Sequence, residues 1–229
     1  METHPYSDLN GFKNQLNLTD DEIINYGFKP GGIWFNNTES IICGTFPPKK
    51  EYFDRKGYIH YSSNKNKLWK HIDAIFNTNL FSNSEDDKSR ILNAKEKIKF
   101  VAEKRLGFID IYSKIERKFE NSSSDCDLIP VENIFNNGVF EEIIKSDVKQ
   151  FIFVYSLSRD EFENHLKDKF PDIQFIKIRE YKNDDITLEV KEVKFNKRTI
   201  YLTYSPIHGN ISDKIRRPAL KKAIEFDFK

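Results

Sequence analysis

Side chains that could bind a ligand gather in residues 41–69, where an apolar run gives way to turn residues and then to a polar loop. The run at 41–43, Ile-Ile-Cys, has the character of a buried parallel strand. The Gly-Thr-Phe-Pro-Pro segment at 44–48 ends this strand with turn chemistry, and an apolar helix pattern begins at Leu68. Open α/β sheets hold their ligands just past the carboxyl ends of such strands. We therefore expect this turn and loop to form a binding site.

The composition is that of a globular α/β protein with a single domain, residues 1–229. Hydrophobic residues make up 38% of the chain and charged residues 32%, and the 20 Phe and 10 Tyr residues do much of the core filling. No apolar run approaches the length of a membrane span. The first residues have neither the basic start nor the apolar centre of a signal peptide. These features predict a cytoplasmic protein that makes no membrane contact.

Cysteine usage argues against a metal–sulfur centre. Cys43 and Cys126 are too few for an iron–sulfur cluster or a four-cysteine zinc site. Cys43 lies inside the expected strand and is interpreted as a small buried hydrophobe. We expect a protein with no metal, no iron–sulfur cluster and no other cofactor.

A net charge of +1 excludes a nucleic-acid binder that acts through bulk charge, so any contact with DNA must come from a local patch. Two basic clusters are candidates, one around the binding loop and one near the carboxyl end. Their members are Lys49, Lys50, Arg55, Lys56, Lys65, Lys67 and Lys70 in the first cluster, and Lys214, Arg216, Arg217, Lys221 and Lys222 in the second. Lysine is common on any soluble surface, so a solvated face is the alternative for each cluster.

Alternating strand and helix patterns predict one three-layer α/β/α domain with a central, mainly parallel sheet. Helices are expected at 20–26, 68–76, 90–104, 139–144 and 162–170. Strands are expected at 41–43, 106–112, 151–155, 173–178, 186–195 and 199–204, with a hairpin turn at 196–197. The chain shows no internal repeat and no long linker.

The binding loop resembles the first motif of the uracil-DNA glycosylase superfamily, especially its hypoxanthine-DNA glycosylase-like branch. Gly-Thr-Phe-Pro at 44–47, Tyr61 and Asn-Lys-Leu-Trp at 66–69 are similar to the Gly-Ser-x-Pro-Gly, Tyr-Tyr-Ala and Asn-x-Phe-Trp pieces of that motif. Gly-Phe-Ile-Asp at 107–110 resembles a Gly-x-x-Asp segment on the second strand of the family. Residues 201–210 lie where the family places a Leu-Pro-Ser-Pro-Ser-Pro-Ala-Asn loop. The matches occur in the family's order and span about two thirds of the chain, which makes them more specific together than singly.

The resemblance implies the chemistry of a DNA glycosylase. Such an enzyme takes a base out of the stack, encloses it against an aromatic face and stabilises the base as it leaves as an anion. Tyr61 aligns with the family's stacking aromatic, and a Tyr packed in the core is the alternative. Asn66 aligns with the key catalytic amide of the hypoxanthine branch, and an ordinary helix cap is the alternative. The expected base-binding residues are Gly44, Thr45, Phe46, Tyr61, Tyr155 and Ser156.

The last motif is expected to contact DNA. Ser205 and Pro206 match the loop that family members press into the minor groove, where a stiff loop holds the flipped state open at little entropic cost. His208 is the second catalytic candidate, because a neutral imidazole can donate a hydrogen bond to a phosphate or to the leaving base. A solvent-exposed loop histidine is the alternative. The expected DNA-binding residues are Lys65, Ser205, Pro206, Asn210, Arg216 and Arg217.

Three departures from the family pattern leave alternatives open. Phe46 stands where other branches carry an Asp or Asn for water activation, which favours the hypoxanthine branch or an inactive relative. Pro48 replaces the usual Gly or Ser, and Tyr155-Ser156 follow the third strand where the family commonly has Asn-Gly. The prediction is a monomeric, monofunctional glycosylase for deaminated or modified bases in DNA. The alternatives are a catalytically silent relative that recognises a modified or everted base, and a glycosylase tuned to a nonstandard base in invading DNA.

Overall fold

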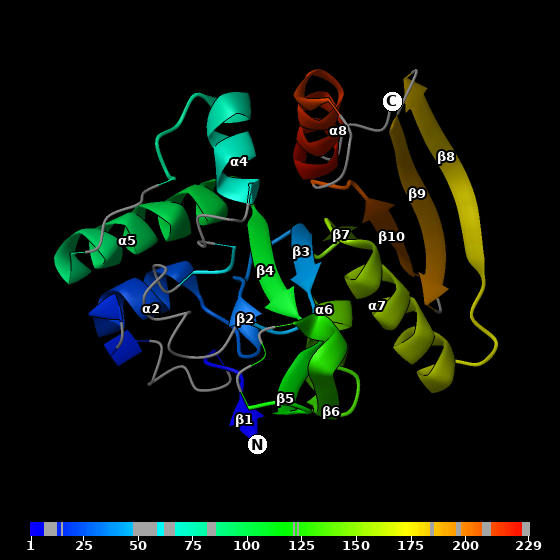
Figure 1. Cartoon of the computed structure of the whole chain (residues 1–229), viewed down its shortest axis with the longest axis horizontal. Coiled ribbons are helices and arrows are strands. Elements are labelled where there is room, and N and C mark those ends of the chain that lie inside the picture. The colour runs from blue at the N-terminus through cyan, green and yellow to red at the C-terminus, as the bar shows by residue number, and fades with distance from the viewer. Residues whose placement is uncertain are drawn as a thin grey trace.

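The computed structural model of the chain describes residues 1–6, 13–14, 16–47, 59–61, 67–81, 86–120, 122, 124–183, 186–195, 198–207 and 212–225. In this part of the chain a seven-stranded sheet has the order β2-β4-β3-β7-β10-β9-β8 (Figure 1). Its four central strands are parallel, namely β4 (Leu106–Asp110), β3 (Ser40–Gly44), β7 (Gln150–Phe153) and β10 (Arg198–Tyr204). Antiparallel strands extend it at both sides, namely β2 (Gly32–Ile33), β9 (Ile186–Phe195) and β8 (Phe175–Asn183).

Helices cover both faces of this sheet. Successive strand residues point to opposite faces, so a strand that is apolar throughout needs a covering layer on each side. Ile42 and Phe108 pack in one hydrophobic cluster with side chains of α4 (Leu68–Phe76), α5 (Asp87–Glu103) and α8 (Asp213–Glu225). Ile41 and Phe151 pack in the other cluster with α6 (Val139–Lys145) and α7 (Ser156–Lys169). The expected fold class, three-layer α/β/α around a mainly parallel centre, is confirmed.

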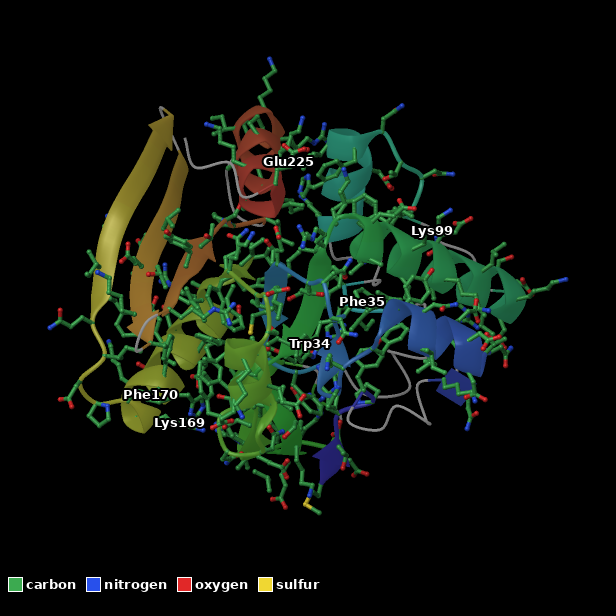
Figure 2. All side chains as sticks on the ribbon, turned by 180° about the vertical axis from the view of Figure 1, so that it is seen from behind. Trp34, Phe35, Lys99, Lys169, Phe170 and Glu225 are labelled. Carbon is green, nitrogen blue, oxygen red and sulfur yellow. The ribbon has the colours of Figure 1, made fainter. Side chains whose placement is uncertain are left out.

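Adjacent residues after β2 make the two-sided packing visible. Trp34 and Phe35 are both fully buried, yet Trp34 belongs to the cluster with α6 and α7, and Phe35 to the one with α4 and α5 (Figure 2). The indole nitrogen of Trp34 donates a hydrogen bond of 3.0 Å to the carbonyl of Pro30. Its polar atom is therefore satisfied while the ring fills the core.

A second, smaller sheet lies beyond the carboxyl end of β4 (Figure 1). It has the order β1-β5-β6 and is antiparallel, with β1 (Glu2–Thr3), β5 (Tyr112–Arg117) and β6 (Leu128–Asn133). The pattern at 106–112 predicts one strand, but β4 ends at Asp110 and β5 begins at Tyr112 in the other sheet. The sequence at 106–112 reads as one strand because the end of β4 and the start of β5 are both buried. A short 3-10 helix, η1 (Asp125–Asp127), precedes β6.

Local capping sets where several helices begin. A capping box between Thr19 and Glu22 begins α2 (Asp20–Tyr26), and Gly27 ends it in the left-handed conformation. Asp86 accepts a hydrogen bond from the backbone of Ser89, so α5 begins three residues before its predicted start. Helix α7 begins at Ser156, directly after β7, rather than at 162. Its first turn, residues 156–159, has Leu157 as its one apolar residue, and that side chain is exposed, so the turn lacks the apolar spacing that predicts a helix.

Candidate active site

The carboxyl ends of the four parallel strands meet at one edge of the sheet. Gly44 at the end of β3 is in register with Asp110 at the end of β4, and Tyr204 at the end of β10 is in register with Phe153 of β7. The residues that follow these strands therefore lie along one edge. They come from four separate parts of the sequence, which begin at residues 45, 111, 154 and 205. This is the edge where open α/β sheets bind ligands.

Gly44 allows two polar side chains to approach the backbone of β3. A Cβ atom at this position would lie 2.1 Å from Oδ1 of Asp110 and 2.9 Å from the hydroxyl oxygen of Tyr61. Side-chain atoms cannot share that space, so any other residue would displace the carboxylate. The glycine of the first motif is therefore required for a close approach, and the polar atoms above it belong to the candidate site.

Tyr61 has an unusual backbone conformation directly over this position. Its φ angle is 60°, in the left-handed region that bulky residues rarely adopt. Its ring lies 6.2 Å from that of Tyr155 at an interplanar angle of 23°, and 5.9 Å from that of Phe108. Burial raises the pKa of the Tyr61 hydroxyl well above its ordinary value, so the group remains a hydrogen-bond donor. Its buried oxygen has no hydrogen-bond partner among the described residues.

Strain of this kind is found at functional sites more often than elsewhere. The structure places Tyr61 beside Gly44 and beside the ring of Tyr155, two other predicted base-binding residues. The stacking role of Tyr61 remains a prediction.

Thr45 and Phe46 already have partners within the protein. The Thr45 hydroxyl donates a hydrogen bond of 2.6 Å to Oδ2 of Asp125, and burial raises the pKa of that carboxyl. The Phe46 ring is buried, meets the His4 ring edge-on at 5.6 Å, and has the guanidinium of Arg117 5.9 Å from its centre. Arg117 also donates to the carbonyl of Pro47 and pairs with Glu2 at 2.7 Å. These contacts fix the turn at 44–47 in one conformation.

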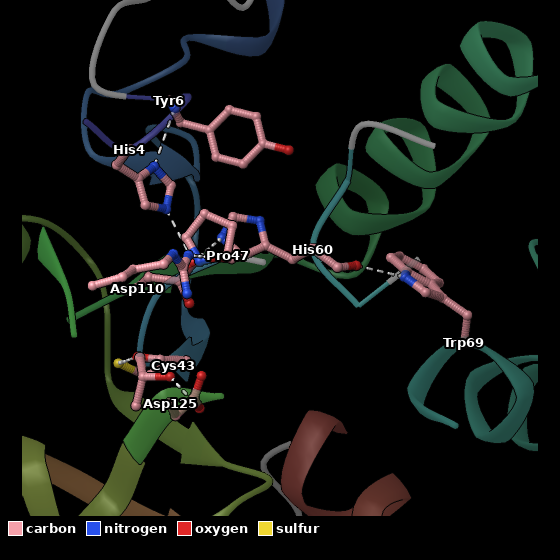
Figure 3. A network of polar contacts seen from close by, with 11 residues as sticks. His4, Tyr6, Cys43, Pro47, His60, Trp69, Asp110 and Asp125 are labelled. Carbon is pink, nitrogen blue, oxygen red and sulfur yellow. Dashed lines mark hydrogen bonds and ion pairs between the residues drawn. The ribbon is translucent and has the colours of Figure 1, made fainter. Parts of the chain in front are cut away.

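A buried polar network behind this turn was not predicted from the sequence. The Nε2 atoms of His4 and His60 lie 2.9 Å and 3.1 Å from the same carboxylate oxygen, Oδ2 of Asp110, and only the His4 contact has hydrogen-bond geometry (Figure 3). All three side chains are almost fully buried. Burial alone would raise the pKa of Asp110, but the electrostatic interaction with His60 and the hydrogen bond from His4 hold it well below its usual range. Asp110 is therefore an ionised carboxylate inside the protein.

The tautomer of His4 follows from its second contact. The backbone N–H of Tyr6 donates to Nδ1 of His4 at 3.1 Å, so Nδ1 carries the lone pair and Nε2 carries the proton. The Nε2–H group then donates to Asp110. Burial lowers the pKa of His4, in agreement with a neutral ring.

This tautomer also bears on whether the three side chains could bind a metal ion. His4, His60 and Asp110 offer three ligand atoms within 4.8 Å of one another. A histidine ligates through a nitrogen lone pair, and His4 has none directed at Asp110. The cluster is therefore better described as a hydrogen-bonded network around a carboxylate than as a three-ligand metal site.

The sequence holds weak signals for two members of this network. Asp110 ends an expected strand and belongs to the Gly-Phe-Ile-Asp match, and His60 directly precedes Tyr61. His4 has no such signal, because β1 brings it to the site from 106 positions away. A cavity of about 390 Å³ reaches His4 and Asp110 from the side of the small sheet. Its lining includes Lys114, Glu132 and Glu142.

The remaining predicted residues at this edge follow β7 and β10. Tyr155 precedes α7, and its carbonyl accepts a hydrogen bond of 3.0 Å from the Ser158 hydroxyl; Ser156 is the exposed first residue of that helix. The backbone N–H of Ser205 donates to the carbonyl of Phe153 at 2.9 Å, which holds the strand end beside β7. The buried Ser205 hydroxyl has no hydrogen-bond partner among the residues described. Pro206 is half-buried beside it.

The two predicted arginines of α8 differ in exposure. The side chain of Arg216 is 2% exposed, and that of Arg217 is 42% exposed. Both pair with Asp213, at 3.4 Å and 3.1 Å. Arg216 therefore faces the core, and of the two arginines only Arg217 has an exposed guanidinium. Contact of Arg217 with a DNA phosphate remains a prediction. The predicted residues Asn66, His208, Lys65 and Asn210 lie outside the described part of the chain.

Comparisons with known proteins give one similar structure. No family model matches the chain, and no curated protein matches it in sequence. A solution NMR structure of a Methanosarcina acetivorans protein proposed to be a uracil DNA glycosylase is 22% identical, with a TM-score of 0.42, over 62% of this chain and 76% of that one. A match at this level does not identify an activity. None of the helices in the described residues is long and apolar enough to cross a membrane.

Proposed function

We propose that this protein is a monofunctional DNA glycosylase, which hydrolyses the N-glycosidic bond of a deaminated or otherwise modified base flipped out of DNA. One observation carries the proposal. Three segments that resemble the motifs of one glycosylase superfamily lie far apart in the sequence, and their residues Gly44, Asp110 and Ser205 all lie at the same edge of the sheet. The ends of parallel strands share an edge in any such sheet, so the further support is the close approach of Tyr61 and Asp110 over Gly44, the glycine of the first motif.

The proposed base pocket uses the strained residue above Gly44. The Tyr61 ring would stack on the flipped base, and its buried hydroxyl would donate to the base or to the sugar. Thr45 and Phe46, which have partners inside the protein, would form the wall of the pocket rather than read the base edge. Asn66 and His208 remain the proposed groups for water positioning and for stabilising the leaving base.

The proposed DNA face lies beside this pocket. Ser205 and Pro206 follow β10 at the same edge and would press against the opened base step. Arg217 on α8 has an exposed guanidinium that would contact a phosphate. Binding is expected to depend on a few such local contacts, because the net charge is only +1.

A specific observation keeps a second function in view, namely a catalytically silent protein that recognises a modified base. Phe46 stands where other branches carry a water-activating side chain, and its ring is buried against His4 and Arg117. An apolar group there cannot activate water. Binding without cleavage would need only the Tyr61 pocket and the DNA face.

The test is incubation with duplexes that each carry one modified base: uracil, hypoxanthine, xanthine or a hydroxymethylated pyrimidine. Alkali then cleaves the strand wherever a base has been removed. The proposal expects cleavage at the modified position of at least one duplex after alkali, and none in the matched unmodified duplex. Tight binding to a modified duplex without any alkali-sensitive site would favour the binding protein.

A further inference from the structure

The imidazole of His60 is held rigidly in the buried network. Its ring lies between those of Tyr6, at 4.9 Å and 27°, and Phe108, at 5.6 Å and 15°. Its backbone carbonyl accepts a hydrogen bond of 2.8 Å from the indole nitrogen of Trp69. The two flanking rings and the anchored backbone fix the direction in which each nitrogen of His60 points (Figure 3).

The two nitrogens of His60 have different surroundings. Nε2 lies 3.1 Å from Oδ2 of Asp110, the oxygen that also accepts the Nε2–H of His4. Both nitrogens are buried and neither makes a hydrogen bond within the described residues, so the contact with Asp110 is what distinguishes Nε2 from Nδ1. His4 differs, because its Nδ1 is occupied by the backbone N–H of Tyr6. Of the two histidines, only His60 therefore has an Nδ1 atom without a hydrogen-bond partner among the described residues.

We propose that His60 accepts the proton of the attacking water through Nδ1, and that Asp110 and His4 are positioning residues for it. This inference rests on the proposed glycosylase function. In the step, the water oxygen bonds to C1′ of the sugar while the bond from C1′ to the base nitrogen breaks. The electron pair of that bond leaves with the base, and the water proton moves to Nδ1 of His60. Asp110 stabilises the imidazolium that results.

The position of His60 suits this role. It directly precedes Tyr61, the proposed stacking residue, whose hydroxyl shares the space above Gly44 with Asp110. The first motif has Phe46 in place of a water-activating acid, and the Phe46 ring contacts His4 of the same network. The network thus supplies a proton acceptor next to the turn that lacks one. His4 donates a hydrogen bond to the same oxygen of Asp110 that His60 approaches.

The kinetic test compares His60→Ala and His60→Gln with the wild type in single-turnover excision on the best modified duplex. Glutamine can keep a hydrogen bond to Asp110 but has no basic nitrogen, so it tests the chemistry in a protein that stays folded. Both variants should lose about a hundredfold or more in rate, with affinity for the same duplex nearly unchanged. Free imidazole should restore part of the rate of His60→Ala. His165→Ala, on α7, is the matched control and should keep the wild-type rate.

A wild-type rate in His60→Gln would overturn the inference while leaving the proposed function in place. The inference would also be overturned if imidazole does not raise the rate of His60→Ala and the melting temperature of this variant is well below that of the wild type. The loss of rate would then follow from lost stability. Absence of excision by the wild type would overturn the proposed function and the proton transfer with it.

The contact between His60 and Asp110 can be tested independently of catalysis, by NMR of protein labelled with ¹⁵N in its histidine rings. The inference expects neutral His60 to carry its proton on Nε2, and Asp110→Asn to abolish that preference. A proton on Nδ1 of His60 in the wild type would overturn the inference, whether or not the protein excises a base.

Discussion

The Nε2 atom of His4 lies 2.9 Å from Oδ2 of Asp110, although 106 positions separate the two residues in the chain. The contact exists because β1 pairs with β5, which follows Asp110 after a single residue. Glu2 strengthens the same junction through its ion pair with Arg117. The start of the chain is therefore part of the candidate site rather than an appendage to the fold.

Stability should fall as the pH is lowered from about 6.5, in part because of His4. Burial lowers its pKa, so His4 stays neutral in the folded protein while the unfolded chain takes up a proton. The unfolded state then binds more protons, and acid favours unfolding. His4→Gln should flatten the fall of the unfolding free energy between about pH 6.5 and 5, by at most about 1.4 kcal/mol per pH unit. Urea titrations at several pH values measure this slope.

His71 is the control for that experiment. It lies on α4, and burial lowers its pKa to about 4, so His71→Gln should flatten the slope in the same direction. The two variants should differ in excision, which only His4→Gln is expected to lower. An unchanged slope in His4→Gln would contradict the neutral, buried tautomer. The titratable groups that face these rings are Asp110 and His60 for His4, and Asp213, Arg216, Arg217 and Lys67 for His71.

Gly44→Ala should greatly lower the excision rate of the protein that remains folded, in addition to lowering stability. The added methyl group would meet Oδ1 of Asp110 at 2.1 Å and so displace the carboxylate. We expect a loss of about 1–3 kcal/mol in unfolding free energy and a large loss of rate in the folded fraction. Gly107→Ala, on the neighbouring strand, is the control, because its methyl group would meet Trp34 rather than Asp110. Equal rates for the two folded variants would argue against the displaced carboxylate.

How much of this site could be predicted depends on the range of the contacts involved. The bounds of α2 and α4 follow from local signals and match the prediction, because caps and apolar spacing act within a few residues. Gly44 and the residues after it match a family motif, so the sequence also predicted that the candidate site would follow the carboxyl end of the strand at 41–43. The His4–Asp110 contact was not, because it depends on strand pairing between distant segments. The burial of Arg216 was missed because α8 was not expected as a helix, so nothing indicated its inward face.

Tyr61 variants should separate its ring from its hydroxyl in the binding of modified DNA. Tyr61→Leu removes the stacking surface and should weaken binding by about 1–3 kcal/mol, which is roughly 5- to 150-fold in Kd. Tyr61→Phe keeps the ring and removes a buried hydroxyl that has no partner among the described residues, so its melting temperature should equal or exceed that of the wild type. Equal affinity of Tyr61→Leu and the wild type in a fluorescence-anisotropy titration would return Tyr61 to a packing role.

Arg217→Gln should flatten the salt dependence of DNA binding by about one unit of slope, because one fewer counterion is released. Lys99→Gln on α5 is the control, since Lys99 is 71% exposed but lies outside both basic clusters (Figure 2). Its slope should match that of the wild type. Affinities measured between 50 and 200 mM salt provide the slopes, and identical values for Arg217→Gln and Lys99→Gln would remove α8 from the DNA face.

The release of a free base tests the glycosylase proposal most directly. Wild-type protein is incubated with each modified duplex, and the small-molecule fraction is analysed by mass spectrometry. The account predicts the intact modified base in solution, in an amount equal to the abasic sites revealed by alkali, with the strand uncut before alkali. Saturated binding of every duplex with no base released from any of them would contradict it.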